Sequence, residues 1–375
     1  MSIPSKEDEF DMFYFHGSLP DMDAEKMLER DGDFLIHSKY IPGNVHDRLY
    51  LLKIFTNFRT LIKYYYKNGL ITPKSSFSLK RPIARSRYQL VHRDIRFQKR
   101  IGRGAYGTVY KGTLIKNHIP VAIKRIASDG KTDATLTDMI REARVMQMFN
   151  HKNIVRFYGF IVNKAPYLLV MELCPNGSLE DKLRKEGEQV SIERRVSYSL
   201  QASRGIEYLH HKSCIHRDIA TRNCLLNNET VKVADFGMCR TTPLYKVDLS
   251  KPQNVRWLSP EVWKTGETNL TTDIYAFGLM LWEMFIIPYV TPYSKWKAAE
   301  VKRRVMAGYR MPTPTGMPPK IAVLMRNCWD QNSCARPKAR DLRRRLEDIY
   351  KDYTDNALSS ASLAQSFSQV GVLDT

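Results

Sequence analysis

The chain has 375 residues, of which 43% are hydrophobic and 11% aromatic, and it carries a net charge of +20. This composition can build substantial cores, which excludes disorder throughout, and no apolar run is long enough to cross a membrane. The N-terminus does not resemble a secretory signal, and the six cysteines include no CxxC pair, which argues against a zinc site and a disulfide framework. We therefore expect a cytoplasmic protein.

Residues 1–12 form an acidic segment, and residues 13–90 form an N-terminal region of mixed periodicity. The spacing of apolar residues predicts two helices and two strands in this region, at 22–30, 58–66, 34–38 and 49–55 respectively. A segment rich in Ser, Pro and basic residues, 74–87, is predicted to be a connector.

Charge is unevenly distributed in the first hundred residues. Residues 1–33 hold ten acidic and three basic residues, whereas residues 59–103 hold thirteen basic residues and the single acid Asp94. Such a basic stretch could bind an anionic surface, including the plasma membrane, although charge runs of this kind are more often solvated connectors. No RNA- or DNA-binding module is recognisable, so we expect no nucleic-acid partner.

Residues 95–350 begin with strands and continue with helices. β-Branched residues predict strands at 108–110 and 121–126, and helical periodicity is clearest at 194–211, 272–285, 297–307 and 339–350. The Ser-rich tail, residues 351–375, lacks strong periodicity and is predicted to be disordered.

The most informative motif is HRDIATRN, which contains Asp218 and Asn223, followed by DFG beginning at Asp235. Asp218 can accept the proton of an attacking hydroxyl, while Asn223 and Asp235 can hold the Mg²⁺ ions that neutralise the phosphates of ATP. A second HRD ends at Asp94, but Lys99 stands where the metal ligand would be and no DFG follows at the right interval. We assign that second motif no catalytic role.

Gly102, Gly104 and Gly107 form the pattern GxGxxG, which dinucleotide-binding folds also use. In a dinucleotide site the glycines lead into a helix, whereas here they lead into a predicted strand and then into VAIK, which ends at Lys124. A glycine-rich turn between two strands can lay its N–H groups over a triphosphate, and Lys124 can reach the α- and β-phosphates. The expected partner of Lys124 is Glu142, on a helix.

These motifs together resemble a protein kinase domain of the tyrosine-specific class, covering residues 95–350. The implied fold is α+β and bilobal, with a β-rich small lobe and a helical large lobe. Arg222 follows the catalytic Asp by four residues, as in tyrosine kinases. Trp257 lies in a segment that resembles the one that positions a substrate tyrosine ring. The Cys328-Trp329 pair is typical of the same class.

The resemblance implies roles for individual residues, with ATP and Mg²⁺ as cofactors. Asp218 would be the base, Arg222 would stabilise the transferred phosphoryl group, and Glu261 would form a structural pair with Arg336. Met171 would gate the adenine pocket, ahead of a hinge at residues 172–174. The residues implied to contact the nucleotide are Ile101, Gly102, Gly104, Gly107, Val109, Lys124, Met171, Glu172 and Cys174.

Tyr245 lies between the DFG motif and Glu261, in the segment that phosphorylation orders in many kinases. We hypothesise that Tyr245 is autophosphorylated and that Arg217 and Arg240 bind the phosphate dianion. An ordinary exposed tyrosine is the alternative.

The sequence FYFHGSLPDMDAEKML, with GDFLIHS and FRTLIKYYYKNG after it, resembles an SH2 domain. An SH2 domain directly before a tyrosine kinase is the arrangement of the Fes/Fer group and its nematode relatives. His37 replaces the Arg that binds phosphotyrosine in that family, and Asp21 stands where a second Arg is usual. The region is also too short between residues 49 and 58 for the usual central hairpin, which an error in the gene model would also explain. We predict a truncated SH2-like domain that binds phosphotyrosine weakly or not at all.

Three functions can be weighed against these residues. The favoured one is an active non-receptor protein tyrosine kinase of intracellular signalling, with tyrosine-containing proteins as substrates. A pseudokinase scaffold would be expected to lack Lys124, Asp218 or Asp235, and all three are present. A phosphotyrosine adaptor would need the Arg that His37 replaces.

Overall fold

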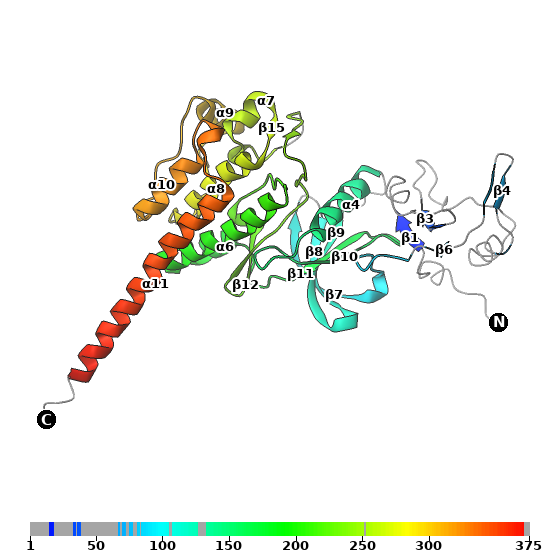
Figure 1. Ribbon diagram of the computed structural model, residues 1–375, viewed down its shortest axis with the longest axis horizontal. Helices are drawn as coiled ribbons and strands as arrows, with labels where there is room; N and C mark the ends of the chain where they lie inside the picture. Colours follow the sequence, from blue (N-terminus) through cyan, green and yellow to red (C-terminus); the bar gives the residue numbers. More distant parts are fainter. Residues whose placement is uncertain are drawn as a thin grey trace. The chain divides into compact units, whose positions relative to one another are not determined.

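The computed structural model describes residues 84–104, 107–126, 133–250 and 253–370, with short backbone segments before them (Figure 1). Side chains are described as far as residue 355. The chain divides into two compact units: unit 1 is Met1–Met148 with Arg156–Leu173, and unit 2 is Phe149–Val155 with Cys174–Thr375.

Unit 1 contains an antiparallel sheet of five strands in the order β10-β11-β9-β8-β7 (Figure 1). The strands are β7 (Ile95–Gly104), β8 (Gly107–Leu114), β9 (Ile119–Ile126), β10 (Phe157–Ile161) and β11 (Leu168–Glu172). Their β-branched and aliphatic residues form one buried cluster, in which Val121, Ile123 and Leu168 have no exposed surface. The strands predicted at 108–110 and 121–126 are confirmed. Helix α4 (Asp133–Gln147) packs beside β10.

The N-terminal region is described only by its backbone strands. β1 (Phe15–Ser18) pairs with β3 (Ile36–Ser38), β2 (Asp33–Phe34) pairs with β6 (Arg81–Pro82), and β4 (Leu70–Thr72) pairs with β5 (Ser75–Phe77). The connector predicted at 74–87 is therefore wrong in part, since β5 and β6 lie within it. Composition indicated a loop there, but Pro is tolerated in a two-stranded pair, where only one edge needs N–H donors.

The strand predicted at 34–38 corresponds to β2 and β3, which cover it except for residue 35. The other predicted elements of this region, at 22–30, 49–55 and 58–66, and the acidic segment 1–12 lie outside the described residues. Asp21 also lies outside them, and of His37 only the backbone is described, in β3. The SH2-like domain and its weak phosphotyrosine binding therefore stay predictions.

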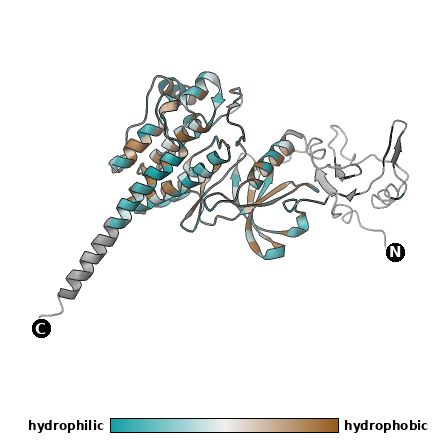
Figure 2. Cartoon of the chain, viewed as in Figure 1, coloured by the Kyte–Doolittle hydropathy of each residue, from teal (hydrophilic) through white to brown (hydrophobic). Residues whose placement is uncertain are grey.

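Unit 2 is mainly helical, and hydrophilic and hydrophobic residues both occur in its helices (Figure 2). Those described are α5 (Leu179–Glu186), α6 (Ile192–His211), α7 (Pro260–Thr265), α8 (Leu270–Phe285), α9 (Ala298–Met306), α10 (Pro319–Cys328) and α11 (Ala339–Val370). Every side chain from Thr272 to Phe285 of α8 is buried, so this helix forms the centre of unit 2. The four helices predicted in this part of the chain are confirmed.

The predicted disorder of residues 351–375 is wrong for most of that tail, because α11 continues to Val370. The segment contains Ser and Gln among Ala and Leu but no Gly or Pro before residue 371, so a helix can run on without a breaker. No helix in the described part of the chain is long and apolar enough to cross a membrane.

Candidate active site

Lys124 and Glu142 form a buried ion pair within unit 1. Lys124 lies on β9, and its Nζ donates to both carboxylate oxygens of Glu142 on α4, at 2.9 and 3.0 Å. The two side chains are only 12% and 7% exposed. The predicted pairing is confirmed, and it holds the ammonium group at a fixed place on the sheet.

The register of the sheet places three predicted nucleotide-binding residues in one row. Gly102 on β7 is opposite Val109 on β8, and Val109 is opposite Lys124 on β9. A Cβ on Gly102 would meet nothing nearer than Val109 Cβ at 3.9 Å, so the packing of the protein does not require glycine there. The missing side chain instead leaves room beside Val109.

Gly107 is required by the backbone itself. It pairs with Gly104 where β7 turns into β8, its φ is +141°, and a Cβ there would lie 2.0 Å from the carbonyl oxygen of Arg125. The last pair of β7 and β8 is therefore formed by two glycines of the GxGxxG pattern, which joins two strands as predicted.

The remaining predicted nucleotide-binding residues lie at the end of the sheet and just after it. Met171 and Glu172 end β11, where they pair with Ala122 and Val121 of β9. Unit 1 ends at Leu173 and unit 2 resumes at Cys174, so the predicted hinge coincides with the boundary between the units. The side chain of Ile101 is 44% exposed on β7.

A buried carboxylate on α8 holds the backbone of the catalytic motif in unit 2. Asp273 is 1% exposed and accepts hydrogen bonds from the N–H groups of His216 and Arg217, both at 2.8 Å. His216 lies 3.1 Å from the carbonyl oxygen of Ala234 through Nε2, and its Nδ1 accepts from the N–H of Asp218 at 3.3 Å. The ring proton must therefore be on Nε2, since a carbonyl oxygen only accepts.

The Asp218 carboxylate is almost surrounded by donors. Arg222 donates to Oδ1, and Asn223 Nδ2 donates to Oδ2 at 2.6 Å and to the Asp218 carbonyl oxygen at 2.7 Å. Asn254 Nδ2 also donates to Oδ1, at 2.8 Å. The guanidinium of Arg222 lies 4.0 Å from the ring centre of Trp257, so the predicted acceptor platform and the predicted base contact the same arginine.

The predicted metal ligands flank the hairpin of β12 (Cys224–Asn227) and β13 (Thr230–Val233). The carbonyl oxygen of Asn223 accepts from the N–H of Ala234 at 2.9 Å, which brings the two ends of the hairpin together. Asp235 follows with φ of 63°, a left-handed conformation that Asp tolerates better than most residues. Such uncommon backbone is often found at functional sites.

Tyr245 lies between two arginines. It opens β14 (Tyr245–Lys246), which pairs with β15 (Glu267–Thr268), and its ring centre is 4.7 Å from the guanidinium carbon of Arg217 and 4.6 Å from that of Arg240. Burial lowers the pKa of Arg217, and the charge of Arg240 lowers it further. The two arginines named from the sequence are thus both at the tyrosine, where a phosphate would offset their mutual repulsion.

A second buried network supports the catalytic motif and was not predicted from the sequence. Glu283 on α8 has no exposed surface and accepts from Tyr289 at 2.8 Å and from the Thr221 hydroxyl at 3.1 Å. Burial raises the pKa of Glu283 to about 7, although these hydrogen bonds oppose the rise. In the sequence, the only indication of a special role for Glu283 is that an acidic residue stands inside an apolar helical segment.

The expected pair of Glu261 and Arg336 is confirmed. Arg336 Nη1 and Nη2 donate to the two carboxylate oxygens of Glu261 at 2.6 and 2.8 Å, and the arginine side chain has no exposed surface.

The second HRD motif has a structural role. His92 contacts Asn163 and Pro166, and the Asp94 carboxylate accepts a hydrogen bond from the N–H of Val91.

Known proteins are similar in sequence to most of this chain. A family model of protein tyrosine and serine/threonine kinases matches residues 95–346. Fer-related kinase 1 of Caenorhabditis elegans is 31% identical over 369 residues, which cover 90% of this chain and 94% of that protein. The chain belongs to the Fer-related protein tyrosine kinases.

Longer relatives of this Fer-related kinase include tyrosine-protein kinase Fer of Rattus norvegicus, which is 34% identical over 366 residues. That match covers 91% of this chain and 44% of rat Fer, so the chain spans less than half the length of that protein. The transforming protein Fps of avian sarcoma virus (strain PRCII) is 31% identical over 348 residues, covering 86% of this chain and 65% of Fps. Members of the kinase family generally use ATP and a divalent metal and act on protein substrates.

Proposed function

We propose that this chain is an active non-receptor tyrosine kinase that transfers the γ-phosphoryl group of ATP to tyrosine hydroxyls of proteins. The observation that carries the proposal is the arrangement at Asp218, a buried carboxylate fixed by Arg222 and Asn223, with the same Arg222 guanidinium over the Trp257 ring. A base held in one orientation by an arginine that also contacts an aromatic ring suits a phenolic acceptor.

In unit 1, Lys124 and the glycine-rich turn bind the triphosphate. The ion pair with Glu142 fixes the orientation of the Lys124 ammonium group, so that it can neutralise the α- and β-phosphates. Gly102 and Gly107 carry no side chain, so the backbone of β7 and β8 can approach the phosphates closely at these two positions.

The residues of unit 2 fit a magnesium site. Mg²⁺ prefers oxygen ligands and usually takes only one or two carboxylates, with substrate phosphates and waters completing its shell. Asp235 offers a carboxylate, and because the amide nitrogen of Asn223 is bound to Asp218, its amide oxygen is the atom left for a metal. Within the described ranges no three His, Cys, Asp or Glu residues gather as a protein-only metal site. When bound, Mg²⁺ supplies positive charge to the β- and γ-phosphate oxygens.

The chemical step needs one proton acceptor and fixed positive charge. The tyrosine oxygen attacks the γ-phosphorus as the bond from that phosphorus to the β,γ-bridging oxygen breaks, and ADP leaves. Asp218 accepts the phenolic proton, and the guanidinium of Arg222 stabilises charge on the transferred group. Most of the acceleration comes from orientation and charge neutralisation.

The proposal is tested by phosphate transfer from ATP to tyrosine-only and to serine/threonine-only peptides, with Asp218→Asn as the matched variant. Transfer to tyrosine that Asp218→Asn abolishes is the expected result. Nucleotide binding without transfer by the parent chain would instead favour the scaffold.

A second experiment tests the proposed phosphosite. Incubation with ATP beforehand should accelerate phosphate transfer by the parent chain but not by Tyr245→Phe. Equal acceleration of both would contradict phosphorylation at Tyr245.

A further inference from the structure

The side chain of Asn254 contacts the catalytic base from a distant part of the chain. Its Nδ2 donates to Asp218 Oδ1 at 2.8 Å, although 36 residues separate the two. Asn254 precedes the short helix η5 (Val255–Trp257), where an Asn side chain commonly caps the first N–H groups, but here it makes no such bond. The Asn254 side chain therefore bonds the proposed base and does not cap the helix that follows it.

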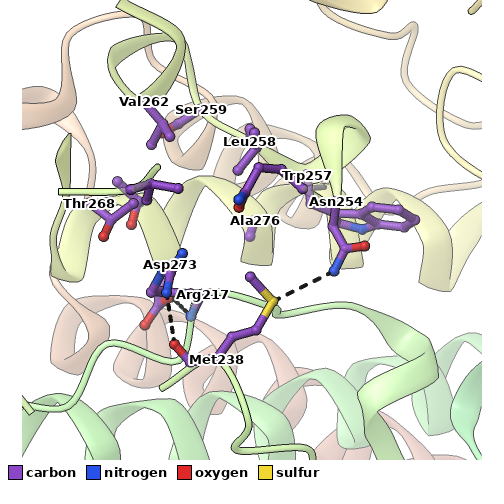
Figure 3. Close-up of a pocket in the computed structure, with 13 residues that line it drawn as sticks. Arg217, Met238, Asn254, Trp257, Leu258, Ser259, Val262, Thr268, Asp273 and Ala276 are labelled. Carbon is purple, nitrogen blue, oxygen red and sulfur yellow. Dashed lines mark hydrogen bonds between the residues drawn. The ribbon is translucent and has the colours of Figure 1, made fainter. Parts of the chain in front are cut away.

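The chemistry of the contact fixes the orientation of the amide. A carboxylate only accepts, so the atom of Asn254 that faces Asp218 must be the nitrogen. The same nitrogen lies 4.0 Å from the sulfur of Met238, the residue that follows DFG (Figure 3). One amide group thus joins the segment of Trp257 to the base and approaches the DFG segment.

Counting acceptor sites shows what this contact leaves for a substrate. An ionised carboxylate has about four acceptor sites, two on each oxygen. Arg222 and Asn254 occupy Oδ1, and Asn223 occupies one site of Oδ2. The remaining acceptor site is on Oδ2, so the three donors both fix the plane of the carboxylate and determine which oxygen can receive a proton.

We propose that Asn254 is a positioning residue for the general base. By holding Oδ1, it directs Oδ2 of Asp218 to the acceptor hydroxyl, and it keeps the segment of Trp257 aligned with that oxygen. The inference rests on the proposed function, because it assigns a role within the same transfer reaction.

The test compares Asn254→Ala, which removes the donor, with Asn254→Asp, which keeps the shape but replaces the donor with an acceptor. Gln253→Ala is the matched control: it alters the neighbouring side chain, which bonds the Asp248 carbonyl oxygen. Rapid-quench single-turnover transfer to a tyrosine peptide reports the chemical step, so slow product release does not hide an effect. The KM for ATP and the melting temperature are measured alongside.

We expect Asn254→Ala to slow transfer about tenfold, since a loosely held base loses part of its alignment, with an unchanged KM for ATP and melting temperature. Asn254→Asp should be slower still, because two carboxylates would face each other, and Gln253→Ala should match the parent chain. Transfer by Asn254→Ala within twofold of the parent, or an equal loss in Gln253→Ala, would overturn the inference and leave the proposed function standing. A parent chain no faster than Asp218→Asn would overturn both.

Discussion

Removing the buried ion pair of Glu261 and Arg336 should destabilise unit 2 strongly. Loss of one partner of a buried pair costs about 3–5 kcal/mol, because the other charge stays buried without compensation. Arg336 has no exposed side-chain surface, whereas Glu261 is 22% exposed. Arg336 would also keep its bonds to the carbonyl oxygens of Asp330 and Thr271, at 2.9 and 3.1 Å. We therefore expect Glu261→Gln to cost about 3 kcal/mol, at the lower end of that range.

Urea unfolding followed by circular dichroism at neutral pH measures this cost. The matched control is Asp352→Asn, which removes an ion pair to Lys320 whose side chains are 51% and 70% exposed, and which should leave the midpoint unchanged. A loss below about 1 kcal/mol in Glu261→Gln would refute the reasoning, since surface pairs already reach that value.

The effect should also depend on pH. Burial alone would raise the pKa of Glu261, but the hydrogen bonds and charge of Arg336 outweigh it, and the folded-state pKa is lowered. A carboxylate with a lowered pKa contributes its full stability above the unfolded pKa of about 4.3 and loses it as pH falls through the folded pKa. The difference between the parent chain and Glu261→Gln should therefore be largest near neutral pH and shrink below about pH 4.

Three further outcomes follow from the other sites. Glu142→Gln should lower kcat/KM for ATP about a hundredfold, because Lys124 loses its fixed orientation; steady-state kinetics would detect it, and an effect under threefold would contradict it. Gly107→Ala should lower the melting temperature, since its Cβ would lie 2.0 Å from a carbonyl oxygen, whereas Gly102→Ala should not. The folded-state pKa of Glu283 is raised, so the free energy of unfolding of the parent chain should fall as pH rises from about 4.5 to about 7. The urea midpoints of Glu283→Gln should not show that fall.

The sequence predicted those parts of the site whose chemistry constrains spacing along the chain. Asp218, Asn223 and Asp235 are recognisable because the proposed base and the proposed metal ligands occupy fixed positions in a short loop and hairpin. Long periodic helices were equally clear, since burial of one face needs a repeat of 3.6 residues.

Features that depend on tertiary contact could not be predicted in this way. Nothing local to Asn254 indicates that its amide reaches Asp218, and the helical segment after residue 350 has a composition that also suits a flexible tail. Glu283 was visible only as an acid in an apolar helix, because its partners come from two other segments.

The path of the chain between the two units has a consequence for synthesis. Phe149–Val155 belongs to unit 2 but is flanked by segments of unit 1. Within it, Asn153 Nδ2 donates to the Val231 carbonyl oxygen at 2.9 Å, and the N–H of Val155 donates to that of Val233 at 3.0 Å. A ribosome adding 5–20 residues per second needs about 4–16 s to pass from residue 155 to residue 233. For that interval this segment has been synthesised without its β-strand partner, so Ile154 and Val155, which are buried in the folded chain, lack their native contacts.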